Sequence, residues 1–140
     1  MLDGKSFEVL ATVKTNYRPE DVASLSGINR FYITDDDGTV HAFDATTFGE
    51  VGRLLRPHAL PYLTSNIISN RLFSTSYLGI DIIDGLSFKI IASIHPGGGR
   101  PIGGRFVAVN SLKNQVYWTS NSLDSAELVS TVDGETSSLN

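Results

Sequence analysis

Three similar stretches decide the fold of this chain: Phe31-Tyr32-Ile33-Thr34, Leu72-Phe73-Ser74-Thr75 and Val116-Tyr117-Trp118-Thr119. Each is short and lies between turn-forming residues. Two of the three are rich in aromatic and β-branched side chains, which is typical of a β-strand. A proline precedes each stretch, and the steps between these prolines are 42 and 40 residues. The chain therefore contains one unit three times.

A second strand follows each stretch and ends in an aspartate and a turn. Its three copies are Val40-His41-Ala42-Phe43-Asp44, Ile80-Asp81-Ile82-Ile83-Asp84 and Val129-Ser130-Thr131-Val132-Asp133. A period near 40 residues made of short strands is typical of β-propeller blades. The sequence therefore predicts an all-β fold of four-stranded antiparallel blades in a single segment, residues 1–140.

The units are predicted to span residues 15–55, 56–94 and 95–140, with strands separated by turns such as Asp37-Gly38. From the innermost outwards, the predicted strands are residues 21–26, 30–34, 39–43 and 48–55 in the first unit, 62–69, 71–75, 79–83 and 87–94 in the second, and 105–109, 115–120 and 127–132 in the third. No stretch has the apolar period of a helix.

The first residues of the chain match the end of a unit. Residues 2–11 resemble residues 83–92, so residues 5–14 are predicted to be an outer strand without a blade of their own. The third unit, in contrast, still needs its fourth strand after Asp133. We therefore expect this terminal strand to be exchanged between the first and the last blade.

Three blades are too few to close a ring, because propellers usually have four to eight. Apolar residues occur on both faces of the strands, so an open arc would leave apolar end faces in water. We expect two copies to form a six-bladed ring as a homodimer. Alternatively, the chain is part of a longer propeller or a module of a larger surface array.

Composition excludes several other classes. The chain has 140 residues, 41% hydrophobic and 19% charged, as in a folded domain. Its net charge of −4 argues against nucleic acid as a partner, and the absence of cysteine excludes disulfides and thiolate sites. No signal peptide or transmembrane segment is visible, so the cytoplasm is the default location, although the compartment stays open.

The repeat resembles the YVTN-type propeller family. The resemblance lies in Leu10-Ala11-Thr12-Val13, Arg18-Pro19, Phe31-Tyr32-Ile33-Thr34-Asp35 and Val40-His41-Ala42-Phe43-Asp44-Ala45-Thr46-Thr47. The second unit departs from the pattern at Ser74, and the third has a longer connection over residues 121–126. The resemblance covers nearly the whole chain and implies a binding or surface protein. A few lactonase-like or dehydrogenase enzymes use similar propellers, and a fold does not by itself transfer a function.

The candidate binding residues are cations in loops that should share one face around a central channel. They are Arg18, Arg56, His58, His95, Arg100 and Arg105. Such a face could bind a protein or a small anionic ligand, because the arginine fork matches carboxylate and phosphate. The competing interpretation is that these residues only tie neighbouring blades together.

No catalytic residue, metal site or cofactor is predicted, so a non-catalytic binding module is the leading hypothesis. Residues 97–104 lack the Lys-Ser/Thr pair of a phosphate-binding loop. Asp35-Asp36-Asp37 is not followed by the ligands of a calcium loop. The alternative is a lactonase-like or other hydrolytic propeller, which would use Glu20 and Asp21 with His58 and His95 at the channel mouth.

Overall fold

The computed structural model describes residues 1–56, 59–95, 104–122 and 125–133, which form three antiparallel sheets and one turn of 3-10 helix. The first sheet contains β1 (Pro19–Leu25), β2 (Arg30–Asp35), β3 (Val40–Asp44) and β4 (Glu50–Leu54), with the helical turn at Ser26–Ile28. The second contains β5 (Ala59–Asn66), β6 (Arg71–Ser76), β7 (Gly79–Asp84) and β8 (Lys89–Ile94). The third contains β9 (Gly104–Asn110), β10 (Gln115–Ser122) and β11 (Ser125–Asp133).

In each sheet, consecutive strands pair as hairpins, and the same turn recurs between the first two strands. Asn29, Asn70 and Asn114 end these turns with φ of 54°, 53° and 52°. Asparagine tolerates this left-handed conformation better than most residues because its short side chain can bond to the backbone nearby. The recurring asparagines therefore fix where the second strand of each sheet begins.

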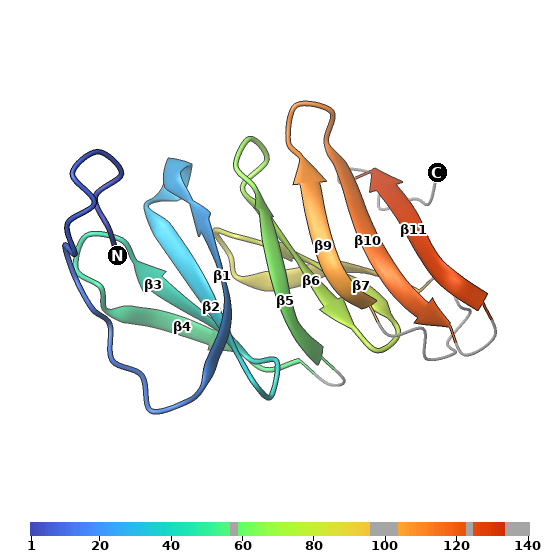
Figure 1. Ribbon diagram of the computed structural model, residues 1–140, viewed down its shortest axis with the longest axis horizontal. Coiled ribbons are helices and arrows are strands. Elements are labelled where there is room, and N and C mark those ends of the chain that lie inside the picture. The colour runs from blue at the N-terminus through green and yellow to red at the C-terminus, as the bar shows by residue number, and fades with distance from the viewer. Residues whose placement is uncertain (57–58, 96–103, 123–124, 134–140) are drawn as a thin grey trace.

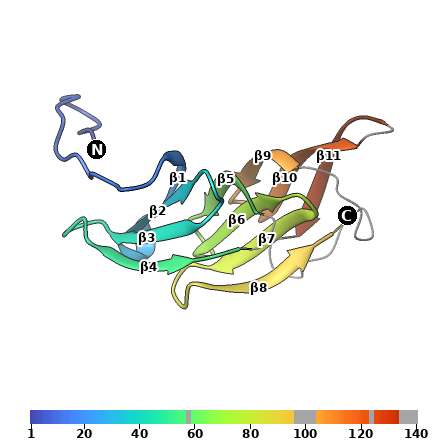
Figure 2. The same ribbon diagram turned by 90° about the horizontal axis from the view of Figure 1, so that it is seen from below.

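The three sheets stand side by side in chain order (Figure 1). Their first strands, β1, β5 and β9, are neighbours, which places all three at one side of the molecule. The N-terminal arm, which we define as residues 1–18, extends away from the first sheet (Figure 2). The N-terminus and β11 lie at opposite ends of this row.

Two hydrophobic clusters hold the row together. Leu25, Tyr32 and Val40 of the first sheet pack against Leu72 and Ile83 of the second. The opposite face of the second sheet packs against the third through a second cluster, which includes Phe73, Ile80, Ile82, Val116 and Trp118. The second sheet is thus buried on both faces, which explains why β7 has apolar residues at consecutive positions.

The predicted all-β architecture and its antiparallel sheets are confirmed, with strand ends shifted by up to three residues. Residues 5–14 belong to none of the three sheets, and the hydrogen bonds of residues 1–11 stay within the arm. In the part of the chain that the structure describes, the third sheet has three strands rather than four. That same part contains no helix with the length and apolar character needed to cross a membrane.

Candidate functional site

The outer face of the first sheet points away from the second sheet and carries apolar side chains. It carries Val22 on β1, Phe31 and Ile33 on β2, and Phe43 on β3. The rings of Phe31 and Phe43 are stacked, with centroids 5.0 Å apart. We call these four residues the open face.

Strand pairing identifies the counterpart of each open-face residue in the second sheet. In the first sheet, Val22 pairs with Ile33, and Phe31 pairs with Phe43. At the same positions of the second sheet, Leu63 pairs with Ser74, and Leu72 pairs with Ile83. The counterparts are covered by the first sheet, and each is less than 5% exposed. Val22, in contrast, is 64% exposed, and Phe31 and Ile33 are partly exposed. Phe43 is only 4% exposed. The rest of the open face thus matches a covered part of the second sheet without having the same cover.

The N-terminal arm runs past this open face and leaves a recess of about 590 Å³ between them. Met1 and Val13 line the recess on the arm side, and Val22, Phe31 and Ile33 line it on the sheet side. Its walls are mostly apolar. A recess of this size and lining favours an apolar occupant over a charged one.

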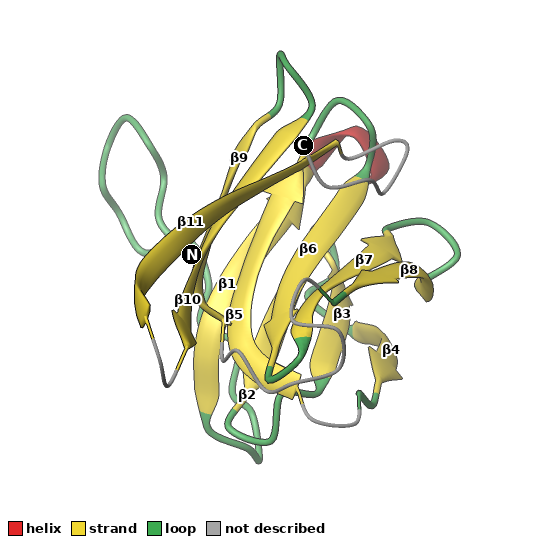
Figure 3. Cartoon of the chain, turned by 90° about the vertical axis from the view of Figure 1, so that its right-hand side faces the viewer, coloured by secondary structure: helices red, strands yellow, loops and turns green. Residues whose placement is uncertain are grey.

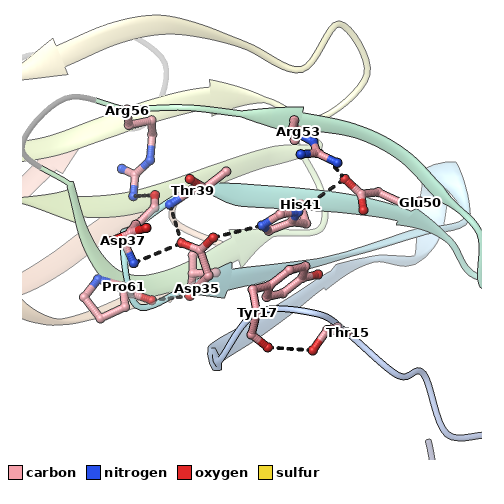
Figure 4. A network of polar contacts seen from close by, with 12 residues as sticks. Thr15, Tyr17, Asp35, Asp37, Thr39, His41, Glu50, Arg53, Arg56 and Pro61 are labelled. Carbon is pink, nitrogen blue, oxygen red and sulfur yellow. Dashed lines mark hydrogen bonds and ion pairs between the residues drawn. The ribbon is translucent and has the colours of Figure 1, made fainter.

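A polar cluster next to the open face anchors the arm (Figure 4). His41 is buried, and its Nε2 lies 3.1 Å from Asp35 Oδ2 while its Nδ1 lies 3.2 Å from Glu50 Oε1. The ring of Tyr17 stacks on the imidazole at a centroid distance of 3.8 Å. Arg53 Nε lies 3.3 Å from the same Glu50 oxygen. The cluster joins β2, β3 and β4 to the arm.

The contacts of this cluster connect its strands to the arm. Both ring nitrogens of His41 lie within hydrogen-bonding distance of carboxylates. Burial, followed by the negative charges of Glu50 and Asp35, raises the pKa of Tyr17 to about 12. Tyr17 therefore stays a neutral phenol near pH 7. Sequence reasoning missed this cluster because no repeat or motif links Tyr17 to His41.

Where the first sheet has His41 and its carboxylate partners, the second sheet has an ion pair between Asp81 and Arg56. Asp81 on β7 occupies the position of His41, and it accepts a hydrogen bond at 3.2 Å from Nη1 of Arg56, which precedes β5. Nη2 of Arg56 donates to the carbonyls of Gly38 and Leu60, and the guanidinium is fully buried. Burial lowers the pKa of Arg56, although Asp81 opposes this shift. Arg56 therefore connects the first sheet to the second. This agrees with the interpretation that the loop cations tie neighbouring sheets together.

The other predicted binding cations behave differently from Arg56. Arg18 is exposed and lies 3.0 Å from Glu20, while His95 and Arg105 are also exposed. His58 and Arg100 lie outside the described residues. Because Arg18 and Arg105 lie at the start of first strands, both are at the same edge of the row (Figure 1). Binding of an acidic group at this edge stays a prediction.

The residues expected for a hydrolytic site have structural partners. Glu20 pairs with Arg18, and Asp21 Oδ2 accepts a hydrogen bond of 2.9 Å from the backbone N–H of Leu63. In the described part of the chain, no group of three or more His, Asp or Glu side chains is placed to hold a metal ion.

Comparisons with known proteins identify the fold only. No protein-family model matches the chain, and no curated protein matches it. Among solved structures, hydrazine synthase from Kuenenia stuttgartiensis is similar, with a TM-score of 0.81 at 15% sequence identity. The match covers 99% of this chain and 40% of the hydrazine synthase chain. The chain thus spans less than half the length of the hydrazine synthase chain that it matches.

Proposed function

We propose that this chain is a non-catalytic β-propeller interaction module. Its three sheets are three blades, and two copies assemble into a six-bladed ring. The 40-residue repeat and the row of sheets with adjacent first strands support this architecture. In such a ring, the third sheet of one copy covers the open face of the other.

One observation carries the proposal: the open face matches an interface that is already buried within the chain. Val22 is 64% exposed, whereas its counterpart Leu63 is 4% exposed under the first sheet. The end of the row formed by the third sheet also exposes apolar surface. Phe106 is 63% exposed, and Tyr117, the counterpart of the buried Tyr32, is partly exposed. Two apolar ends of one row favour association with each other.

The function of the ring is to present one edge to a partner, namely the edge at which the first strands of the sheets begin. Arg18 and Arg105 are exposed there, His95 is exposed directly after β8, and arginine is suited to bidentate contact with carboxylates or phosphates. We propose an acidic protein segment or a small anion as the ligand. Among the described residues, the exposed side chains of this edge provide binding groups for such a ligand.

The test is the native mass of the purified chain over a range of concentrations. We expect a species of twice 15.2 kDa that persists on dilution. Val22→Asp should yield monomers, because it places a charge in the interface while the separate chain keeps this position exposed. A stable monomer of the unchanged chain would contradict the two-copy ring and favour membership of a longer propeller.

The matched control is Val51→Asp on β4. Val51 is exposed, and its counterpart Ile91 on β8 stays 49% exposed even though the first sheet covers the second. Val51→Asp should therefore keep the dimer. Loss of the dimer in both variants would show that added charge alone, rather than the open face, controls association.

A further inference from the structure

Residues 1–11 fold into a hairpin whose turn is the same as two turns inside the sheets. The carbonyls of Asp3, Asp44 and Asp84 accept hydrogen bonds of 2.9–3.0 Å from the backbone N–H groups four residues later. Those later residues are Phe7, Phe48 and Phe88, with φ of 60°, 59° and 55°. The other two turns connect the third and fourth strands of a sheet. The hairpin in the arm therefore has the same turn as the connection between the third and fourth strands of such a sheet.

The pairing within the arm has the same register as those sheets. Leu2 pairs with Val9, as Phe43 pairs with Glu50 and Ile83 with Ile90. Beyond this pair, Ala11, Val13, Thr15 and Tyr17 are partly buried, while the residues between them are exposed. A period of two is typical of extended chain. Residues 8–13 thus match the fourth strands β4 and β8 in turn, register and conformation.

The third sheet, in contrast, lacks a fourth strand within the described residues. Its order is β11-β10-β9, and β11 occupies the place of the third strands β3 and β7. Within the described residues, β11 pairs with β10 only, so no described strand pairs with its outer edge. Figure 3 shows β11 in front of the other strands, at the end of the row. Such an edge is a ready template for another strand.

We infer that residues 8–13 of one copy add to β11 of a second copy as its fourth strand, which presupposes the two-copy ring proposed above. The recess beside the open face would then receive side chains of the second copy's third sheet. Met1 and Val13 of the arm already line this recess. One partner molecule can therefore pair with the strand of the arm and also cover the recess. Two such exchanges make the ring symmetric.

The second sheet predicts the register of this pairing. Asp81 lies opposite Ser93, and Ser93 Oγ donates to Asp81 Oδ1 at 2.6 Å. Ser130 and Thr12 hold the equivalent positions on β11 and in the arm. Thr12 of one copy is therefore expected opposite Ser130 of the other.

An engineered cross-link tests this register, because the chain contains no cysteine of its own. The variant Thr12→Cys/Ser130→Cys is oxidised mildly and run on a non-reducing gel. We expect a covalent dimer as the main product, because residues directly opposite on one face are within reach of a disulfide. The control Ala11→Cys/Ser130→Cys shifts one partner to the other face of the strand and should cross-link at least ten times less.

The outcomes separate strand donation from the ring. A dimer by native mass that forms no covalent dimer would keep the ring and overturn strand donation. Equal cross-linking of both variants would also overturn it, since contact would then lack a register. A disulfide within one chain would contradict donation as well, because the arm and β11 lie at opposite ends of the row. A stable monomer of the unchanged chain would instead remove the ring and donation together.

Discussion

The ring of Tyr17 lies flat on the imidazole of His41, with centroids 3.8 Å apart and planes 12° apart. Tyr17 belongs to the arm and His41 to β3, so this contact joins the arm to the first sheet. Asp35 and Glu50 hold the imidazole from both sides. The position of the arm therefore depends on a histidine whose two ring nitrogens are fixed.

The first prediction concerns the titration of Tyr17. Burial and two nearby carboxylates raise its pKa from 10.0 to about 12. Because the folded pKa is the higher one, the stabilisation is fully present below pH 10 and is lost as the pH rises towards 12. Absorbance near 295 nm should show late titration of both Tyr17 and Tyr32, because burial raises the pKa of Tyr32 as well, and Tyr17→Phe should remove only part of this late phase. A late phase of unchanged amplitude in Tyr17→Phe would contradict the assignment to Tyr17.

The second prediction concerns His41. Replacement by alanine removes the shared partner of Asp35 and Glu50 and leaves the partly buried carboxylates facing an empty space. We expect a loss of about 3 kcal/mol in the free energy of unfolding, measured with urea. Arg53→Gln, which affects an exposed partner of Glu50, should cost less than about 1 kcal/mol. Equal losses in the two variants would contradict a central role for the imidazole.

Much of the fold could be predicted from the repeat, whereas the polar cluster could not. In the turns after Asp44 and Asp84, the aspartate carboxylate accepts hydrogen bonds from backbone N–H groups. Because this contact lies within a few residues, the recurring aspartate is visible in the sequence. The sequence groups Arg56 with the ligand-binding cations because other cations lie in equivalent loops. Its burial depends on Asp81, 25 residues away, and only the packing of two sheets brings them together.

The third prediction concerns Asp84, whose side chain accepts hydrogen bonds from the backbone and the hydroxyl of Ser87. These bonds lower the pKa of Asp84 below 3.8. Because the folded pKa is the lower one, the stabilisation is present above pH 3.8 and is lost as the pH falls below it. Asp84→Ala should lower the urea midpoint at pH 7 and weaken the dependence of stability on acid. Asp36→Ala, at an exposed turn position, should change neither quantity.

The fourth prediction compares two glycines that hold the same place in the recurring turn, Gly85 and Gly4. A methyl group on Gly85 would lie 2.2 Å from Leu25 Cδ1 and 2.7 Å from the carbonyl oxygen of Asn70, whereas one on Gly4 would meet nothing within 4 Å. Gly85→Ala should therefore cost about 1–3 kcal/mol of stability by forcing the first two sheets apart.

Gly4→Ala should leave the stability of the separate chain within about 0.5 kcal/mol of the original. Thermal or urea unfolding of both variants measures the difference. In the second sheet, the carbonyl of Gly85 also accepts a hydrogen bond of 2.8 Å from the Tyr32 hydroxyl, so the turn is part of the sheet-to-sheet contact. Because Gly4 has no such contact within the chain, equal destabilisation by the two variants would mean that the turn itself, and not the packing against Leu25, requires glycine.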